Sequence, residues 1–350
     1  MKIGLFTDSY LQLNGVSRHV HNIAVALAKR GHEVTVYTSR GHSEHYKVAN
    51  MPYLPFLFEK NYDVIIPNRL RFDIDVAHSH TPWVCGWWGV LFSRKPTVTT
   101  THTAPQQMFS MYRANFLDPI GWSYLISFHN HSDHVICQTK YTERQFREHG
   151  LDRPVTIASA SIDTKTFEKG NGSRFIRKYA LPKEFVLCTT RISPEKRPEL
   201  IAKACEELGY PVVFTAEGPL MEELKRKYKS AVFLGHIHYA DIPDAYHAAK
   251  LFVSASEFET EGLVVPEALA SGTPVISSNI PTMAEIIKDG ENGFLFNTYD
   301  ELKKKLEILW EDKKLRSKFS KNGLHAAKEK DIEVVTDRLE KVYEDLIAKS

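Results

Sequence analysis

The sequence is poor in cysteine and has no long hydrophobic run. Its four cysteines, Cys85, Cys137, Cys188 and Cys205, lie far apart without any C-x-x-C pair. This spacing excludes a disulfide-rich secreted domain and indicates reduced, mostly buried thiols in a cytosolic protein. The longest apolar run, Trp83 to Phe92, has ten residues, about half of what a membrane-spanning helix needs. A spanning segment is therefore not expected.

A strong charge of either sign is also lacking. The 45 Lys+Arg and 43 Asp+Glu residues leave a net charge of +2, which gives no reason to expect nucleic acid as a partner. Residues Met1 to Thr7 are typical of a first β-strand and not of a signal peptide. The expected localisation is cytoplasmic, with a peripheral position on the inner face of the membrane as a second option.

Histidine is unevenly distributed, since twelve of the sixteen precede Lys169. The H-x-H pairs include His78 with His80 and His129 with His131, but no H-E-x-x-H motif supplies a third ligand. These pairs by themselves therefore do not predict a metal site.

Strands that alternate with helices predict an α/β fold with parallel sheets covered on both faces. The first strand is followed by an amphipathic helix from Val16 to Arg30 and a strand from Glu33 to Thr38. The turn before this helix has Gly15 but no G-x-G-x-x-G, so a dinucleotide is not expected there. One glycine suits close approach of a phosphate or sugar, and an ordinary tight turn is an equal alternative.

Two domains are expected from 350 residues. A polar, glycine-bearing stretch around residues 163–173 is the predicted linker. It divides the chain into Rossmann-like domains at residues 1–168 and 169–330. Residues 331–350 are expected to form a C-terminal helix whose apolar stripe packs on either the first or the second domain.

In the first half, His102 follows a strand predicted from Pro96 to Thr101. It would lie at the C-terminal edge of the sheet, where open α/β sheets bind ligands; local hydrogen bonding is an even alternative. Residues 53–70 are expected to be irregular, and residues 104–119 to form a mobile hydrophobic lip.

An interfacial lipid or an anionic membrane surface would suit several features of this half. They are the aromatic run from Trp83 to Phe92, the residues after His102, and the basic residues Lys60, Arg69 and Arg71. Core aromatic residues and a solvated basic surface are an equally weighted interpretation.

The second half is organised around the stretch from Glu259 to Gly272, in which Glu259 and Glu267 flank Gly262 and a short apolar run. The pattern predicts a loop and then a helix that begins near Leu263. A helix N-terminus attracts anions, and carboxylates accept hydrogen bonds from sugar hydroxyl groups. A nucleotide-sugar would use both, whereas a plain helix start with acidic residues is the ordinary alternative.

A basic loop, Arg191 to Arg197, follows an earlier strand of this half. The planar guanidinium of Arg191 can donate paired hydrogen bonds, and the ammonium of Lys196 is a compact positive charge. Together they suit two phosphate groups. A second loop, Ala216-Glu217-Gly218-Pro219, is predicted at the same edge of the sheet. A solvated charged turn remains the alternative for the basic loop taken alone.

Taken together, these residues resemble a retaining glycosyltransferase of family 4, with the GT-B fold of two Rossmann-like domains facing across a cleft. Glu259 and Glu267 match the family's pair of Glu residues, which have seven residues between them. Arg191 and Lys196 match the family's diphosphate clamp. The loop at residues 216–219 is similar to the family's G-x-G-P turn.

In the first half, residues 78–82, Gly86 and residues 101–103 resemble the branch that acts on lipid acceptors, such as diacylglycerol glucosyltransferases. Three positions depart from the family pattern. Asn14-Gly15 stands where the family has two glycines, and Glu261 stands where it has an aromatic residue. The turn before the linker reads Ala158-Ser-Ala-Ser161.

The resemblance implies transfer of a hexose from a UDP- or GDP-linked donor with retention of configuration. The catalytic residues it implies are His102, Arg191, Lys196 and Glu259. The donor-binding residues it implies are Gly15, Arg191, Lys196, Glu217, Gly218, Glu259, Gly262, Leu263, Val264 and Glu267. Because cationic side chains and a helix start would neutralise the diphosphate, no metal or other cofactor is expected.

The expected acceptor is a membrane lipid such as diacylglycerol, with a soluble sugar or polyol as the alternative. Two further classes of function stay open: a nucleotide-sugar epimerase with the same architecture, and a non-catalytic module that binds sugar nucleotides. The expected partners are thus a nucleotide-sugar and a lipid or anionic membrane surface, and no nucleic acid.

Overall fold

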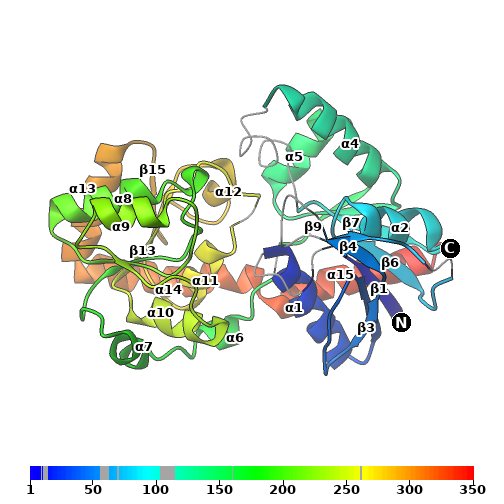
Figure 1. Ribbon diagram of the computed structural model, residues 1–350, viewed down its shortest axis with the longest axis horizontal. Helices are drawn as coiled ribbons and strands as arrows, with labels where there is room; N and C mark the ends of the chain where they lie inside the picture. Colours follow the sequence, from blue (N-terminus) through cyan, green and yellow to red (C-terminus); the bar gives the residue numbers. More distant parts are fainter. Residues whose placement is uncertain are drawn as a thin grey trace. The chain divides into compact units, whose positions relative to one another are not determined.

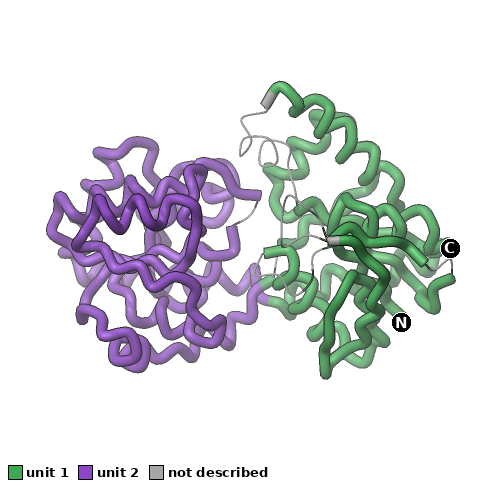
Figure 2. Tube along the Cα trace, viewed as in Figure 1, with its two compact units in different colours: residues 1–161, 332–350 green, residues 162–331 purple. Residues whose placement is uncertain are grey.

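The computed structural model describes all residues except 9, 11–14, 56–62, 69–70, 103–114, 160 and 261. The chain divides into two compact units (Figure 2). Unit 1 comprises Met1–Ser161 and Ile332–Ser350, and unit 2 comprises Ile162–Asp331. Each unit has its own parallel sheet and its own core, so each is described by itself.

The sheet of unit 1 has the strand order β3-β2-β1-β6-β7-β8-β9, and every neighbouring pair is parallel (Figure 1). The chain leaves β1 toward one edge of this sheet and leaves β6 toward the other, so a topological switch point lies between them. The strands are β1 (Lys2–Phe6), β2 (Glu33–Thr38), β3 (Lys47–Asn50), β6 (Val76–Ser79), β7 (Thr97–Thr100), β8 (His134–Cys137) and β9 (Val155–Ile157).

Helices cover this sheet, and one of them comes from the far end of the chain. The helices are α1 (Gly15–Lys29), α2 (Val84–Phe92), the 3-10 turn η1 (Asn115–Leu117), α4 (Asp118–Asn130), α5 (Lys140–Glu148) and α15 (Ile332–Ile347). In Figure 1, α15 (red) lies beside α1 (blue). Val335, Leu339 and Tyr343 of α15 are buried in the same cluster as Ile3 and Leu5 of β1. Unit 1 therefore contains the C-terminal helix.

Ion pairs also hold α15 in unit 1. Arg30, just after α1, lies 2.6 Å from Glu333, 2.7 Å from Asp337 and 2.5 Å from Glu340. These carboxylates recur at helical spacing on one face of α15, so a single guanidinium reaches all three.

Unit 1 differs from the sequence-based prediction in two places. Residues 53–70 were expected to be irregular, but β4 (Tyr53–Pro55) and β5 (Asp63–Ile65) form an antiparallel pair. The helix α4 was not predicted, because its exposed apolar residues blur the helical period. Most of the hydrophobic lip expected at residues 104–119, and the basic residues Lys60 and Arg69, lie outside the described residues.

Unit 2 has a parallel sheet with the order β12-β11-β10-β13-β14-β15. Its switch point lies between β10 and β13. The strands are β10 (Val186–Cys188), β11 (Val212–Phe214), β12 (Val232–Phe233), β13 (Leu251–Ser254), β14 (Val275–Ser278) and β15 (Phe294–Phe296).

Helices pack on both faces of this sheet. They are α6 (Thr164–Phe167), α7 (Gly172–Tyr179), α8 (Pro198–Leu208), α9 (Met221–Lys227), α10 (Ile242–Ala248), α11 (Val264–Ala270), α12 (Pro281–Ala284), α13 (Tyr299–Glu311) and α14 (Lys313–Ala327), with 3-10 turns η2 (Pro194–Lys196), η3 (Tyr239–Asp241) and η4 (Lys328–Lys330). Successive strand residues point to opposite faces, so Leu187 and Phe252 enter one buried cluster while Val186 and Leu251 enter another.

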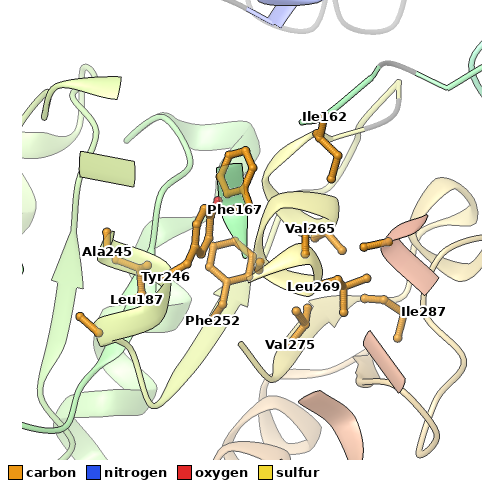
Figure 3. Close-up of a cluster of buried hydrophobic side chains, with 14 of the residues drawn as sticks. Ile162, Phe167, Leu187, Ala245, Tyr246, Phe252, Val265, Leu269, Val275 and Ile287 are labelled. Carbon is orange, nitrogen blue, oxygen red and sulfur yellow. The ribbon is translucent and has the colours of Figure 1, made fainter. Parts of the chain in front are cut away.

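The division between the units falls earlier than the boundary predicted at residue 168. Ile162 and Phe167 are buried in the core of unit 2 with Tyr246 and Val265 (Figure 3). The stretch expected to be a linker is mostly helical. Its polar residues are helix caps: Asp163 accepts a hydrogen bond from the amide of Thr166 at the start of α6. Capping residues and linker residues have similar composition, which explains the error.

Two sequence-based expectations concern thiols and membranes. All four cysteines are free and buried, which confirms the prediction for the thiols. Among the described residues, no helix combines the length and apolar character needed to cross a bilayer.

Candidate functional site

The candidate residues of unit 2 come from loops at the C-terminal edge of its sheet. Arg191 lies in the loop after β10, Glu217 in the loop after β11, and Glu259 in the loop after β13. The β10 and β13 loops flank the switch point, where ligands of open α/β sheets bind. The fold therefore brings together residues that lie up to 68 positions apart (259 − 191).

Backbone hydrogen bonds join the first two loops. The amide of Ile192 donates to the carbonyl of Glu217 at 3.0 Å, and the amide of Leu220 donates to the carbonyl of Ile192 at 3.1 Å. A Cβ atom on Gly218 would lie 2.2 Å from the Ile192 carbonyl oxygen. Only glycine fits there, so the resemblance to a glycine-containing turn has a local steric cause.

An ion pair crosses the switch point. Lys196 Nζ lies 2.5 Å from Glu259 Oε1, with side-chain exposures of 18% and 12%. The amide of Glu257 also donates to the carbonyl of Glu195 at 2.9 Å, so backbone and side chains both fasten the β10 loop to the β13 loop. Because both charges are largely shielded from water, their attraction is stronger than that of a surface pair.

Arg191 differs from Lys196 in its surroundings. Its side chain is exposed, and no ion pair to it is found within the described residues. A guanidinium without a carboxylate partner keeps its planar set of donors available for an anion. Glu217, in the adjoining loop, is also exposed.

Glu267 is buried, with 2% of its surface exposed, in the first turn of α11. Its Oε2 accepts a hydrogen bond of 3.0 Å from the hydroxyl of Tyr246, which also lies 3.1 Å from the Val264 carbonyl oxygen and 3.0 Å from Thr189 Oγ1. Tyr246 thus orients Glu267. Sequence reasoning did not identify Tyr246, because a tyrosine in a short helix carries no signal of a site.

The start of α11 is built as expected around Gly262. This residue has φ +75°, the left-handed region that glycine adopts at little cost, and a Cβ there would lie 3.1 Å from Glu259 Cγ. Leu263 precedes the helix and Val264 begins it, and α11 has no side-chain cap. Their amide groups are therefore of the kind that an anion satisfies. Glu261 lies outside the described residues.

The remaining candidates lie in unit 1. Gly15 is exposed at the start of α1. His102 follows β7, where its Nε2 lies 3.3 Å from His80 Nδ1 and its Nδ1 lies 2.8 Å from the Gln138 amide nitrogen. Burial lowers the pKa of His102 and of His80 well below the ordinary value, and it lowers the pKa of His19 to about 4. All three imidazoles are therefore neutral at pH 7.

Comparisons with known proteins agree with this architecture. Residues 13–166 match the model of Glycosyltransferase Family 4, and residues 173–326 match that of Glycosyl transferases group 1. The two matches together cover most of both units. The chain belongs to the family 4 glycosyltransferases.

Curated relatives of this glycosyltransferase include enzymes named for lipid and for mannosyl transfer. The alpha-monoglucosyldiacylglycerol synthase of Acholeplasma laidlawii is 27% identical, over 100% of this chain and 98% of the relative. That of Streptococcus pneumoniae is 27% identical, over 85% of this chain and 75% of the relative. A GDP-mannose-dependent alpha-mannosyltransferase of Corynebacterium glutamicum is 24% identical, over 100% of this chain and 90% of the relative.

Solved structures share the fold at low identity. Sucrose-phosphate synthase from Thermosynechococcus elongatus aligns with a TM-score of 0.83 at 19% identity, over 100% of both chains. The Anabaena protein HepE, solved in complex with UDP and glucose, aligns with a TM-score of 0.80 at 17% identity, over 99% of this chain and 100% of that one. The glycosyltransferase thus has two parallel-sheet α/β domains of the GT-B type, as predicted.

Proposed function

We propose that this glycosyltransferase transfers a hexose from a UDP- or GDP-linked donor to a membrane lipid such as diacylglycerol, with retention of configuration. The observation that carries the donor part is the Lys196–Glu259 ion pair at the switch point of unit 2. In this proposal Lys196 supplies a cation for a diphosphate and Glu259 a carboxylate for sugar hydroxyl groups, close to Gly262 before the uncapped start of α11.

Each residue at this edge has a proposed role. Arg191, Lys196 and the amide groups from Gly262 to Val264 would neutralise the diphosphate as charge develops on the leaving group. Glu267, held by Tyr246, would accept hydrogen bonds from the ribose hydroxyls, and Glu259 from the sugar. This assignment makes electrostatic stabilisation and positioning the main sources of rate enhancement.

The Lys196–Glu259 contact refines these roles. Each side chain satisfies the charge of the other, so neither is left unpaired in a partly buried place. When a diphosphate and a sugar bind, Lys196 would turn to the phosphate and Glu259 to a hydroxyl. No metal is needed to neutralise the leaving group in this scheme.

Gly15 and His102 keep the roles that the family resemblance implies, close approach to a donor phosphate and a hydrogen bond to the donor sugar. Glu217 and Gly218, in the loop after β11, would contact the donor from that side. Similar proteins are consistent with either nucleotide, since HepE was solved with UDP and the Corynebacterium enzyme is named for GDP-mannose.

The lipid acceptor is supported by the surface of unit 1. Leu91 and Phe92 at the end of α2 are 50% and 39% exposed, and Ile120 of α4 is 66% exposed. The helices α2 and α4 adjoin, because Trp87 Nε1 donates to the Tyr124 hydroxyl at 3.0 Å. Exposed apolar residues with cationic neighbours suit a membrane interface.

The exposed cations Arg94 and Lys95 directly follow α2 and would face anionic headgroups. A peripheral position on the inner face of the membrane, in the cytoplasm, follows as part of the proposal. The curated relatives named alpha-monoglucosyldiacylglycerol synthase are consistent with it.

A transfer assay tests the proposal. The full chain is incubated with radiolabelled UDP-glucose or GDP-mannose, with vesicles of diacylglycerol and phosphatidylglycerol, with a soluble polyol, or with no acceptor. Nucleotide release that depends on the vesicles supports lipid glycosylation, and an α-configured product, identified by NMR coupling constants, supports retention.

Other outcomes overturn parts of the proposal. Release with the polyol alone replaces the lipid acceptor with a soluble one. Conversion of the free donor in the arm without acceptor indicates an epimerase. Donor binding without turnover in any arm indicates a binding module.

A further inference from the structure

A buried carboxylate holds the loop between β6 and α2, residues 80–83. Asp8, which follows β1, is 2% exposed. Its Oδ2 accepts a hydrogen bond of 2.6 Å from the Thr81 hydroxyl, and its amide donates to Thr81 Oγ1 at 2.9 Å. The amides of Cys85 and Gly86 donate to Asp8 Oδ1 at 2.9 Å and to Oδ2 at 3.4 Å. One side chain therefore fastens both the loop and the first turn of α2 to β1.

The helix α2 depends on this contact for its N-terminal cap. Trp83 is its N-cap residue and makes no side-chain cap within the described structure. Free amide groups at a helix start need acceptors, and the helix dipole favours a negative charge there. Asp8 supplies both, although it precedes Trp83 by 75 positions (83 − 8). Because this cap comes from a separate strand, it ties the position of α2 to β1.

The loop also packs so closely on α2 that only glycine fits beneath it. A Cβ atom on Gly86 would lie 1.7 Å from the Thr81 carbonyl oxygen, and one on Gly89 would lie 2.7 Å from Phe6 Cγ. The Ser79 hydroxyl donates to the Gly86 carbonyl at 2.9 Å. These contacts give the glycine at residue 86 a steric cause. They also leave the loop little room to move independently of α2.

This loop carries residues of the apolar α2–α4 surface that supports the lipid acceptor. Tyr124 of α4 donates a hydrogen bond to the Pro82 carbonyl and stacks on Trp83, with ring centroids 6.1 Å apart. Val84, which begins α2, is 39% exposed. A shift of the loop would therefore displace side chains on the proposed acceptor side.

The ionised carboxylate of Asp8 is kept at a cost to stability. Burial raises the pKa of Asp8 from 3.8 to about 6, although its hydrogen bonds act in the opposite direction. The folded chain thus holds this proton more tightly than the unfolded chain, so stability is lost as the pH rises through about 6. Burial also raises the pKa of Cys85 and Tyr124, which interact with Asp8 from α2 and α4, so both are neutral at pH 7. A charge retained at such a cost is typical of a functional position.

We propose that Asp8 is a positioning residue for the acceptor, which it serves by holding the β6–α2 loop at the acceptor side of unit 1. This inference rests on the proposed function, because it takes the α2–α4 surface as the place where the acceptor binds. Asp8 acts through Thr81 and the first turn of α2. Its own carboxylate is too deeply buried to touch a substrate.

Transfer kinetics with the full chain test the proposal. Diacylglycerol in phosphatidylglycerol vesicles is varied at saturating donor, and the donor is varied at saturating diacylglycerol. Asp8→Ala should raise the KM for the acceptor by about 10-fold or more and change the KM for the donor by less than about two-fold. Thr81→Val should act in the same direction, and Thr81→Ser, which keeps the hydroxyl, should bring the acceptor KM back toward the wild-type value.

Asp133→Ala is the matched control. Asp133 also exchanges hydrogen bonds with a threonine: its Oδ2 accepts from the Thr97 amide at 2.8 Å and from the Thr97 hydroxyl at 2.9 Å, and its amide donates to Thr97 Oγ1 at 3.0 Å. This pair lies at the N-terminal end of β7, away from the β6–α2 loop. Both KM values of Asp133→Ala should therefore stay within about two-fold of the wild type.

Hydrogen exchange gives a readout that needs no turnover. In Asp8→Ala the amides of Cys85 and Gly86 should exchange about 10-fold faster or more, because they lose their acceptor. Circular dichroism checks that each variant is folded. If Asp8→Ala is not, the comparison of Thr81→Val with Thr81→Ser decides.

The possible failures can be told apart. An equal rise in both KM values, an equal effect in Asp133→Ala, or unchanged exchange would overturn the role of Asp8 and leave lipid transfer in place. Wild-type transfer to a soluble polyol alone would instead overturn the lipid acceptor. The same KM comparison with the polyol then decides whether Asp8 positions the acceptor.

Discussion

The hydroxyl of Tyr343 in α15 lies 2.6 Å from Nδ1 of His78 in β6, although 265 residues separate them. The other ring nitrogen of His78 lies 2.7 Å from Thr100 Oγ1, so all three polar groups are satisfied in a fully buried place. This contact joins the last helix of the chain to the central strands of unit 1. It makes residues 332–350 an integral part of that unit.

Tyr343→Phe should destabilise unit 1 by about 1–3 kcal/mol, because a buried ring nitrogen of His78 loses its partner. The free energy of unfolding, measured with urea, gives the value. Tyr141→Phe is the control, since Tyr141 is not buried. Equal stability of Tyr343→Phe and the wild type would contradict a structural role for this hydrogen bond.

Lys196→Ala should lower kcat/KM by about 100-fold or more, since it removes a cation from the developing charge on the diphosphate. Lys203→Ala is the matched control: Lys203 is a half-exposed lysine of α8 with an i,i+4 partner. It should retain activity within about two-fold. Steady-state kinetics with the active donor measures both, and comparable losses in the two variants would argue against a specific role.

Tyr246→Phe should raise the KM for the donor by about five-fold, because Glu267 loses the hydroxyl that orients it and a net hydrogen bond is worth about 1 kcal/mol. Glu267→Gln should have a larger effect, since a neutral amide accepts ribose hydrogen bonds less strongly than a carboxylate. Donor-dependence curves separate KM from kcat. A Tyr246→Phe effect confined to thermal stability would remove this tyrosine from the site.

Gly218→Ala should reduce activity while the unit stays folded. The new Cβ would lie 2.2 Å from the Ile192 carbonyl oxygen, so the β10 and β11 loops must separate and Arg191 must shift with them. Ser230→Ala, at an exposed turn of the same unit, is the control. Activity and circular dichroism are measured together, and wild-type activity of Gly218→Ala would show that loop spacing is not critical.

Stability should fall in acid partly through His129. Burial lowers the pKa of this residue from 6.5 to about 3, so between these values the unfolded chain binds a proton that the folded chain does not. The stabilising contribution is complete above pH 6.5 and is lost as the pH falls through about 3. Within this window His129 should contribute about 1.4 kcal/mol for each pH unit.

Urea unfolding at several pH values measures that slope. His129→Asn should show a slope smaller by this amount, whereas His131→Gln, an exposed neighbour, should keep it. Identical slopes in the wild type and His129→Asn would contradict the assignment.

Much of the fold was predictable, because local periodicity determines it. The strand from Glu33 to Thr38 and the helix from Pro198 to Leu208 have the predicted bounds. The strands β3 and β15 were missed, since three or four residues give too short a pattern. The helices α6 and α7 were missed because their caps have the composition of a linker.

The candidate site was predictable as a set of residue types and not as a set of contacts. The order of strands and loops along the chain indicated that Lys196 and Glu259 lie in loops at the same edge of one sheet. It did not indicate that they pair, nor that Tyr246 holds Glu267. Side-chain partners across 63 residues depend on which strands become neighbours, and that order is decided by packing.

The sequence by itself determined the alternation of strands and helices and the spacing of the acidic pair, since each depends on residues close in the chain. Only the tertiary structure decided that α15 completes unit 1 and that His19, His80 and His102 meet. These relationships arise when parallel strands align their C-terminal ends at one edge, which joins segments that share no local pattern.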